Sequence, residues 1–201
     1  MTKRRKIIGA VLAGGSSSRM GRDKAFLPLN GSSMIQHVVG TLRSVFEEVV
    51  IVGGNAKSFE FLHLPVVSDR YKGCGPLAGI HAALLHSSRS SVFVLPCDAP
   101  FISSELVEYV VDSKSHSQTR ITLMDDVLQP LCGLYAPSAL AVIDRNLRRG
   151  VYGILRALKE VDHDVVPIVA ELPFYNPHLF RNVNRPEEYL KVVKAHEASL
   201  T

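Results

Sequence analysis

Residues 12–24, with the sequence LAGGSSSRMGRDK, combine small residues with cations directly after an apolar run. Glycine and serine let backbone N–H groups and hydroxyls approach anionic oxygens. Arg19 and Lys24 add positive charge that can neutralise a polyphosphate. The segment matches neither GxGxxG nor GxxxxGK[ST], so the two most familiar nucleotide fingerprints are excluded. The alternative is a flexible surface turn, which explains the small residues but not the cations, and we therefore expect phosphate binding.

Asp98 is the candidate metal ligand, because it closely follows the apolar run of residues 91–96. In open α/β sheets, ligands bind outside the carboxyl ends of the strands. Mg²⁺ needs only one or two carboxylates when water and phosphate oxygens complete its coordination. The alternative is an aspartate that caps the turn before Pro100. Cys97 has no assignable histidine partner, and we expect it to be a small buried residue, not a nucleophile.

Asp69 is a second candidate carboxylate, placed after a short apolar run and before a helix start at Gly75-Pro76. It can accept hydrogen bonds from ribose hydroxyls or from guanine N1–H and N2–H, and a nearby helix N-terminus favours anionic groups. Guanine offers adjacent donors on one edge, whereas cytosine does not. The alternative is that Asp69 only caps a turn before Gly73.

Asn182 and Asn184 are candidates for binding a second ligand near the end of the chain. Alternation places both on one face of an extended segment, so their amides can converge on one molecule. The alternative is structural, with Asn184 and Pro186 introducing a last helix.

The elements that position these residues follow from the hydrophobic pattern. Apolar runs of strand length alternate with longer stretches of helical period, which is typical of a parallel α/β sheet. We expect one doubly wound, mostly parallel sheet flanked by helices. Strands are expected over residues 6–12, 49–52, 65–68, 91–96, 121–124, 131–135 and 165–169, with a turn at 125–126. Helices are expected over residues 33–46, 76–85, 103–112, 138–149 and 153–161, and from residue 186 onward.

Composition excludes several classes of protein. The 201 residues are 46% hydrophobic and 21% charged, which is an ordinary globular balance. No apolar run approaches the roughly 20 residues of a membrane helix, and the basic N-terminus lacks a typical signal cleavage site. Three widely spaced cysteines suggest neither a disulfide framework nor a zinc ribbon, so we expect a cytoplasmic protein. The eight histidines show no metal-ligand spacing and are expected to be mostly solvated.

The chain resembles the molybdenum cofactor guanylyltransferases, the MobA family of the nucleotidyltransferase superfamily, over nearly its whole length. The motifs that carry the resemblance are LAGG at 12–15, RMG at 19–21, Asp23-Lys24, Asp69 before GPLAG at 75–79, CDxP at 97–100 and NxNxPEE at 182–188. This family transfers GMP from GTP to molybdopterin with release of pyrophosphate. The resemblance implies a Rossmann-like nucleotidyltransferase fold in a single domain over residues 1–201, with a nucleotide half of about 1–100 and an acceptor half of about 101–201.

The resemblance also assigns roles to residues. It implies nucleotide binding by Leu12, Ala13, Gly14, Gly15, Lys24, Asp69 and Asp98. It implies catalytic roles for Arg19, Lys24 and Asp98, with Mg²⁺ held by Asp98. Asn182 and Asn184 would lie on the acceptor side, and the stretch 129–131 would contribute shape there. The partners are GTP and molybdopterin, with transient contact to cofactor-biosynthesis or acceptor proteins and none to nucleic acid or membrane.

The expected chemistry is an in-line displacement at the α-phosphate. The terminal phosphate of the pterin is already a nucleophilic anion, so positioning and charge neutralisation suffice without a general base. The chain departs from the family after its second strand, where Gly53-Gly54 replace an asparagine and Asn55 is shifted by two positions. Other functions remain open. They are a molybdopterin cytidylyltransferase, a sugar-phosphate nucleotidyltransferase, a nucleotide-binding regulator without transfer activity, and a nucleic-acid binder using the basic residues 3–6.

Overall fold

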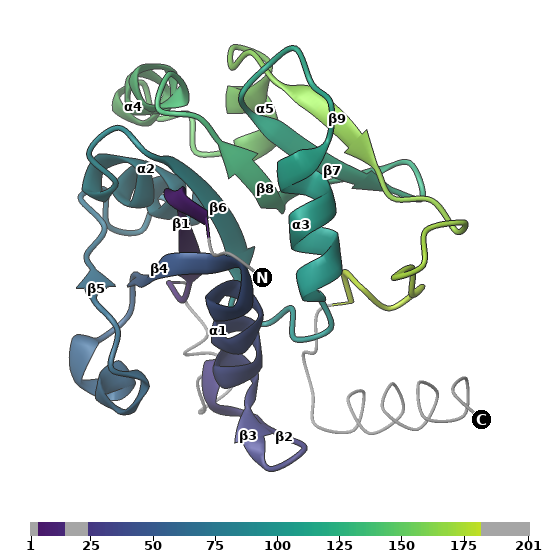
Figure 1. Cartoon of the computed structure of the whole chain (residues 1–201). Coiled ribbons are helices and arrows are strands. Elements are labelled where there is room, and N and C mark those ends of the chain that lie inside the picture. Colours follow the sequence, from purple (N-terminus) through teal and green to yellow (C-terminus); the bar gives the residue numbers. More distant parts are fainter. Residues whose placement is uncertain (1–3, 15–23, 182–201) are drawn as a thin grey trace.

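Figure 1 shows the computed structural model of the chain, in which residues 4–14 and 24–181 are described. The main sheet contains β1 (Arg4–Leu12), β4 (Phe46–Val52), β5 (Val66–Val67), β6 (Ser91–Pro96), β7 (Arg120–Met124), β8 (Val127–Tyr135) and β9 (Asp164–Pro167). The helices are α1 (Met34–Val45), α2 (Pro76–His86), α3 (Ser104–Asp112), α4 (Ala139–Arg148) and α5 (Ile154–Leu158). Two 3-10 helices, η2 (Lys24–Phe26) and η3 (Ala56–Leu62), and a small hairpin of β2 (Pro28–Leu29) and β3 (Ser32–Ser33) complete the described elements.

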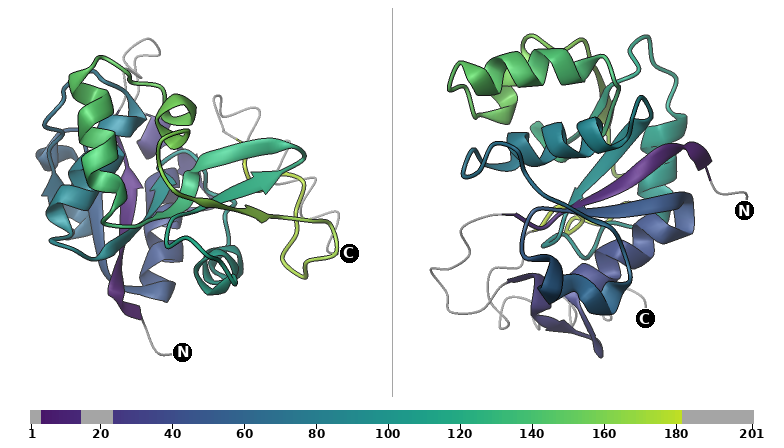
Figure 2. Two further views of the ribbon diagram at one scale, coloured as in Figure 1. Left: turned by 90° about the horizontal axis from the view of Figure 1, so that it is seen from above. Right: turned by 90° about the vertical axis from the view of Figure 1, so that its left-hand side faces the viewer.

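The seven strands lie in the order β5-β4-β1-β6-β8-β7-β9. β8 is antiparallel to both of its neighbours, and the other described pairings in this sheet are parallel. Helices cover both faces. In the right-hand view of Figure 2, α2 and α4 lie on one side of the strands and α1 lies on the other. The expectation of a doubly wound, mostly parallel sheet is therefore confirmed.

Alternate residues of the central strands pack into two separate apolar cores. Val11 and Leu95 face a core that also contains residues of α1 and α3. Ala10 and Val94 face the opposite core, which contains residues of α2, α4 and α5. Because both faces are buried, the central strands read as continuous apolar runs without alternation. No helix among the described residues is long and apolar enough to span a membrane.

Local sequence explains most element boundaries. A capping box joins Ser33 and Gln36 at the start of α1, and Ser103 accepts a hydrogen bond from the backbone of Leu106 at the start of α3. Pro76 occupies the first turn of α2, where its missing N–H costs nothing. The helix expected over residues 153–161 is shorter in the structure, where α5 ends at Leu158.

The described part of the structure contains two tight hairpin turns, of which one was predicted from the sequence. Asp125 and Asp126 both adopt positive φ, at 50° and 59°, which matches the tight turn expected there. β8 consequently begins at Val127, four residues before the predicted start. Asn30 and Gly31, with φ of 44° and 81°, form a second such turn, between β2 and β3, which was not predicted from the sequence.

Candidate functional site

The four parallel strands of one half of the sheet end at the same level. Leu12, the last residue of β1, pairs with Val52 of β4 on one side and with Pro96 of β6 on the other. Val52 in turn pairs with Val67, the last residue of β5. Every loop that leaves these strands therefore starts at one edge, where an open α/β sheet presents groups to a ligand.

Backbone hydrogen bonds hold the first residues of these loops together beyond the strand ends. The N–H groups of Ala13, Gly53 and Cys97 donate across the sheet, to Val52 O at 2.8 Å, Val67 O at 2.8 Å and Leu12 O at 3.1 Å. The edge is thus fixed by main-chain contacts. These contacts fix the first residue of each loop that follows β1, β4 and β6.

Gly14 and Gly53 are in direct backbone contact at this edge. A Cβ added at Gly53 would lie 2.8 Å from Gly14 Cα and 2.9 Å from Gly14 N, and Gly53 has a φ of +84°. An asparagine at this position, as the family resemblance would have it, would require the backbone to move. Asn55 does not take this place, because its side chain is exposed and caps η3 by accepting from Lys57 N at 3.1 Å.

Asp69 lies against the same two glycines. A Cβ at Gly14 would be 3.4 Å from Asp69 Oδ2, and a Cβ at Gly53 would be 3.6 Å from it. The other oxygen, Oδ1, is buried and has no hydrogen-bond partner among the described residues. Burial raises the pKa of this carboxyl, and the nearby imidazole of His81 partly opposes that shift. A ligand that brings hydrogen-bond donors to Oδ1 would compensate an otherwise unfavourable buried acceptor.

Asp98 lies at the same edge, two residues after the end of β6, and is half-buried. The described residues contain no group of three or more His, Cys, Asp or Glu side chains that could hold a metal ion. A single carboxylate can still hold Mg²⁺, because this ion takes most of its ligands from water and phosphate. Cys97 is half-buried and not fully buried as predicted, since it follows the strand directly at the open edge.

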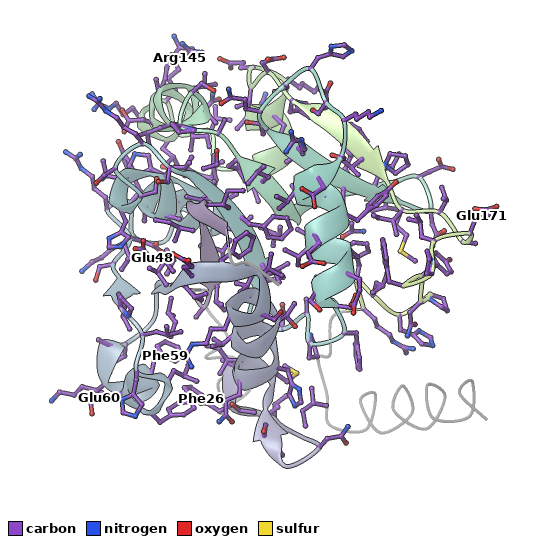
Figure 3. All side chains as sticks on the ribbon, in the orientation of Figure 1. Phe26, Glu48, Phe59, Glu60, Arg145 and Glu171 are labelled. Atoms are coloured by element: carbon purple, nitrogen blue, oxygen red, sulfur yellow. The ribbon has the colours of Figure 1, made fainter. Side chains whose placement is uncertain are left out.

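The segment after Lys24 is anchored close to the Gly53 loop. Phe26 stacks on Phe59 with ring centroids 5.5 Å apart and an interplanar angle of 19°, and both are labelled in Figure 3. A Cβ at Gly54 would come within 2.6 Å of the Phe59 ring. The first residues of η2 therefore lie beside the loop that follows β4. The side chain of Lys24 itself is outside the described part of the chain.

Four predicted site residues lie outside the described residues, namely Gly15, Arg19, Asn182 and Asn184. The structure brings together Leu12, Ala13, Gly14, Asp69 and Asp98 at the edge of the sheet.

A cavity of about 190 Å³ opens between the end of β6 and β8. Its lining is mostly apolar, and Gln129 contributes an amide. The residues around it are Pro96, Ala99, Ile102, Gln129, Pro130, Leu131, Cys132, Ile154 and Phe180. The stretch 129–131, expected to shape the acceptor side, thus lies next to the strand that leads to Asp98.

One cluster of polar side chains was not predicted from the sequence. Tyr71, His81 and Arg148 all contact the carboxylate of Asp144. His81 is only 2% exposed and is an exception to the expectation that most of the histidines are solvated. The i,i+4 spacing of Asp144 and Arg148 was the one local signal for the cluster.

Comparisons with known proteins agree with this geometry. Residues 9–181 match the family model of the MobA-like NTP transferase domain. A molybdenum cofactor guanylyltransferase of Desulfosudis oleivorans is 30% identical over 207 residues, which cover 96% of this chain and 96% of that protein. The crystal structure of molybdopterin-guanine dinucleotide biosynthesis protein A from Archaeoglobus fulgidus is 28% identical with a TM-score of 0.77 and covers 95% of this chain and 99% of its own.

A third neighbour shares the fold alone. The 4-diphosphocytidyl-2C-methyl-D-erythritol synthase of Anaerococcus prevotii has a TM-score of 0.70 at 13% identity, and the match covers 96% of both chains. The architecture therefore serves proteins named for different nucleotides. Discrimination between donors must come from side chains and loops at the edge of the sheet.

Proposed function

The chain belongs to the MobA-like NTP transferase family, and we propose that it transfers GMP from GTP to molybdenum-bound molybdopterin, releasing pyrophosphate. The product is the guanine dinucleotide form of the molybdenum cofactor. The observation that carries the proposal is the meeting of Gly14, Asp69 and the strand before Asp98 at one edge of the sheet. A phosphate loop, a nucleoside carboxylate and a metal carboxylate there provide what nucleotidyl transfer needs.

Asp69 is the group we propose for guanine or its ribose. The unpartnered Oδ1 supports this role, because guanine N1–H and N2–H or ribose hydroxyls are the donors that it lacks. Cytosine carries no pair of adjacent donors on one edge. Transfer of CMP or of a sugar-phosphate nucleotide is therefore the less favoured reading of this site.

Catalysis would rest on Arg19, Lys24 and Asp98. Arg19 and Lys24 are proposed to neutralise negative charge on the triphosphate and to hold it for in-line attack. Asp98 is proposed to hold Mg²⁺, which when bound neutralises further charge on the phosphates. The attacking phosphate of the acceptor is already an anion, so no side chain needs to remove a proton.

The acceptor would bind on the other side of Asp98. The cavity beside Gln129 is smaller than the roughly 300–1,000 Å³ of a complete ligand pocket, so it would take only part of molybdopterin. Asn182 and Asn184 are proposed to complete this side. The nucleotide half is accordingly about residues 1–100 and the acceptor half about 101–201, in one domain. We also place the reaction in the cytoplasm, where GTP is available, with transient contact to proteins that deliver or receive the cofactor.

The test is pyrophosphate release with each of the four nucleoside triphosphates, with and without molybdopterin. The proposal predicts release that requires both GTP and molybdopterin. Faster transfer from CTP would instead identify a cytidylyltransferase. Nucleotide binding without pyrophosphate release under any condition would identify a nucleotide-binding regulator. Binding to nucleic acid that weakens steeply with salt would identify a nucleic-acid binder that uses the basic residues 3–6.

A further inference from the structure

The loop that carries Asp69 has little support of its own. It leaves β5, which is only two residues long, and it reaches α2 at Pro76. Gly73 and Gly75, with φ of 75° and 72°, have open space where a Cβ would be. Within the loop, the described backbone contact is a long one, from Cys74 N to Tyr71 O at 3.4 Å. The position of Asp69 must therefore depend on contacts that the loop makes elsewhere.

Tyr71 provides such a contact, two residues after Asp69. Its hydroxyl donates to Asp144 Oδ1 at 2.7 Å, although the two residues are 73 positions apart in the chain. Its ring meets the imidazole of His81 edge-on, with centroids 5.2 Å apart at 78°. The loop is thereby fastened both to α2, which follows it, and to α4, which belongs to the other half of the chain.

The carboxylate of Asp144 contacts polar groups of three side chains. Besides Tyr71, His81 Nε2 lies 3.2 Å from Oδ1, and Arg148 Nε donates to Oδ2 at 2.8 Å. The side chain of Asp144 is 24% exposed and that of His81 is 3% exposed. Hydrogen bonds to an ionised acceptor are stronger than those between neutral groups, and the hydroxyl of Tyr71 is the main reason that the pKa of Asp144 is lowered.

His81 takes part as a neutral imidazole. Burial lowers its pKa, even though the carboxylate of Asp144 opposes that shift. Its Nδ1 is buried and has no hydrogen-bond partner among the described residues, so a proton there would be a buried unpaired donor. The remaining proton is then on Nε2 and is donated to Asp144. The positive charges of Arg70 and Arg148 also lower the pKa of this imidazole.

We propose that Asp144 is a positioning residue for the nucleotide. By holding Tyr71 and His81 against α4, it fixes the loop that presents Asp69 to the nucleoside. The inference rests on the proposed role of Asp69, and it adds that a residue of the acceptor half determines how tightly the donor binds. Asp144 itself need not touch the nucleotide.

The test measures equilibrium binding of GTP with Mg²⁺ and without molybdopterin, so that it does not depend on transfer. Asp144→Ala removes all three contacts and should raise the Kd for GTP about tenfold. Asp144→Asn keeps an oxygen for the Tyr71 hydroxyl and should recover part of that loss. Tyr71→Phe removes only a neutral hydroxyl, so this variant should fold even if Asp144→Ala does not. It should also weaken GTP binding.

Arg145→Ala is the matched control on the same helix. Arg145 pairs with Glu160 at 2.7 Å, and Figure 3 shows it on the outer side of α4. Within the described part of the chain Arg145 pairs with Glu160 and not with the loop, so its removal should leave the Kd for GTP unchanged. A similar loss in Arg145→Ala would show that any disturbance of α4 weakens binding, and it would overturn the inference.

A double-mutant cycle separates positioning from a general structural role. If Asp144 acts through Asp69, then Asp144→Ala should add little to the loss already caused by Asp69→Ala. Independent, additive losses would contradict the inference. The role of Asp144 would be rejected, and the proposed function retained, if Asp69→Ala weakened GTP binding while Tyr71→Phe and Asp144→Ala bound GTP normally. If the unaltered protein did not bind GTP, the proposed function itself would be rejected.

Discussion

Gly14 and Gly53 touch each other through their main chains, and the contact leaves no room for a side chain at Gly53. The Cβ that any other residue would bring to position 53 would lie 2.8 Å from Gly14 Cα. This contact closes the space between the loops after β1 and β4, against the carboxylate of Asp69. A glycine at position 53 is therefore part of how this chain packs its loops.

Gly53→Ala should disturb both the fold and the site. The φ of +84° and the contact with Gly14 together should lower the free energy of unfolding by about 1–3 kcal/mol and weaken GTP binding. Gly31→Ala is the matched control, because Gly31 has a φ of +81° but nothing within 4 Å of an added Cβ. Denaturant unfolding and GTP titration of both variants would measure this, and equal effects would rule out the contact as the cause.

Arg19→Ala and Lys24→Ala should each lower kcat for transfer by on the order of 10² or more, because each removes a charge aimed at the transferring phosphates. Steady-state kinetics on variants with unchanged circular dichroism would measure this. Near-native rates in folded variants would remove these residues from the site.

Cys97→Ser and Cys97→Ala should retain transfer activity, apart from any loss caused by lower stability. Direct displacement between phosphates has no use for a thiolate. Turnover and thermal unfolding of the two variants would test this together. Detection of a nucleotidyl group covalently bound to Cys97 by mass spectrometry would contradict direct displacement.

Asp69→Asn should weaken GTP binding and yet stabilise the ligand-free protein at neutral pH. The pKa of Asp69 is raised by burial, so the unfolded chain loses this proton first as pH rises above about 3.8. The ionised form thus costs stability above the pKa of the folded state, and asparagine removes that cost. Unfolding at pH 7 and at about pH 2.5 would test the sign, since the gain should vanish where the carboxyl is protonated in both states. A loss of stability at pH 7 would contradict it.

Local patterns in the sequence were sufficient to predict most of the sheet and helices. The apolar run of β6 was predicted over its observed bounds, and α3 begins within one residue of its predicted start. The Asn30-Gly31 hairpin had an equally local signal that was not used. Loop residues at the strand ends could also be predicted, because parallel strands bring their carboxyl ends to one edge.

Contacts between distant residues could not be predicted in this way. Tyr71 and Asp144 are 73 positions apart, and no periodicity links them. The burial of His81 depends on the packing of α2 against α4, which a single sequence does not specify. The backbone contact of Gly14 with Gly53 likewise follows from the register of two strands and was visible in the sequence only as a pair of glycines.

The rate of GMP transfer by Asp98→Asn as a function of Mg²⁺ concentration tests the central claim most directly. That claim is that transfer takes place at this edge of the sheet, with charge neutralised by a metal ion on Asp98. Asparagine keeps the shape of the side chain but removes its charge, so the variant should fold normally and lose most of its activity. Raising the Mg²⁺ concentration should recover part of it, because an amide oxygen remains a weak ligand. An unchanged rate and an unchanged dependence on Mg²⁺ in the folded variant would contradict the account.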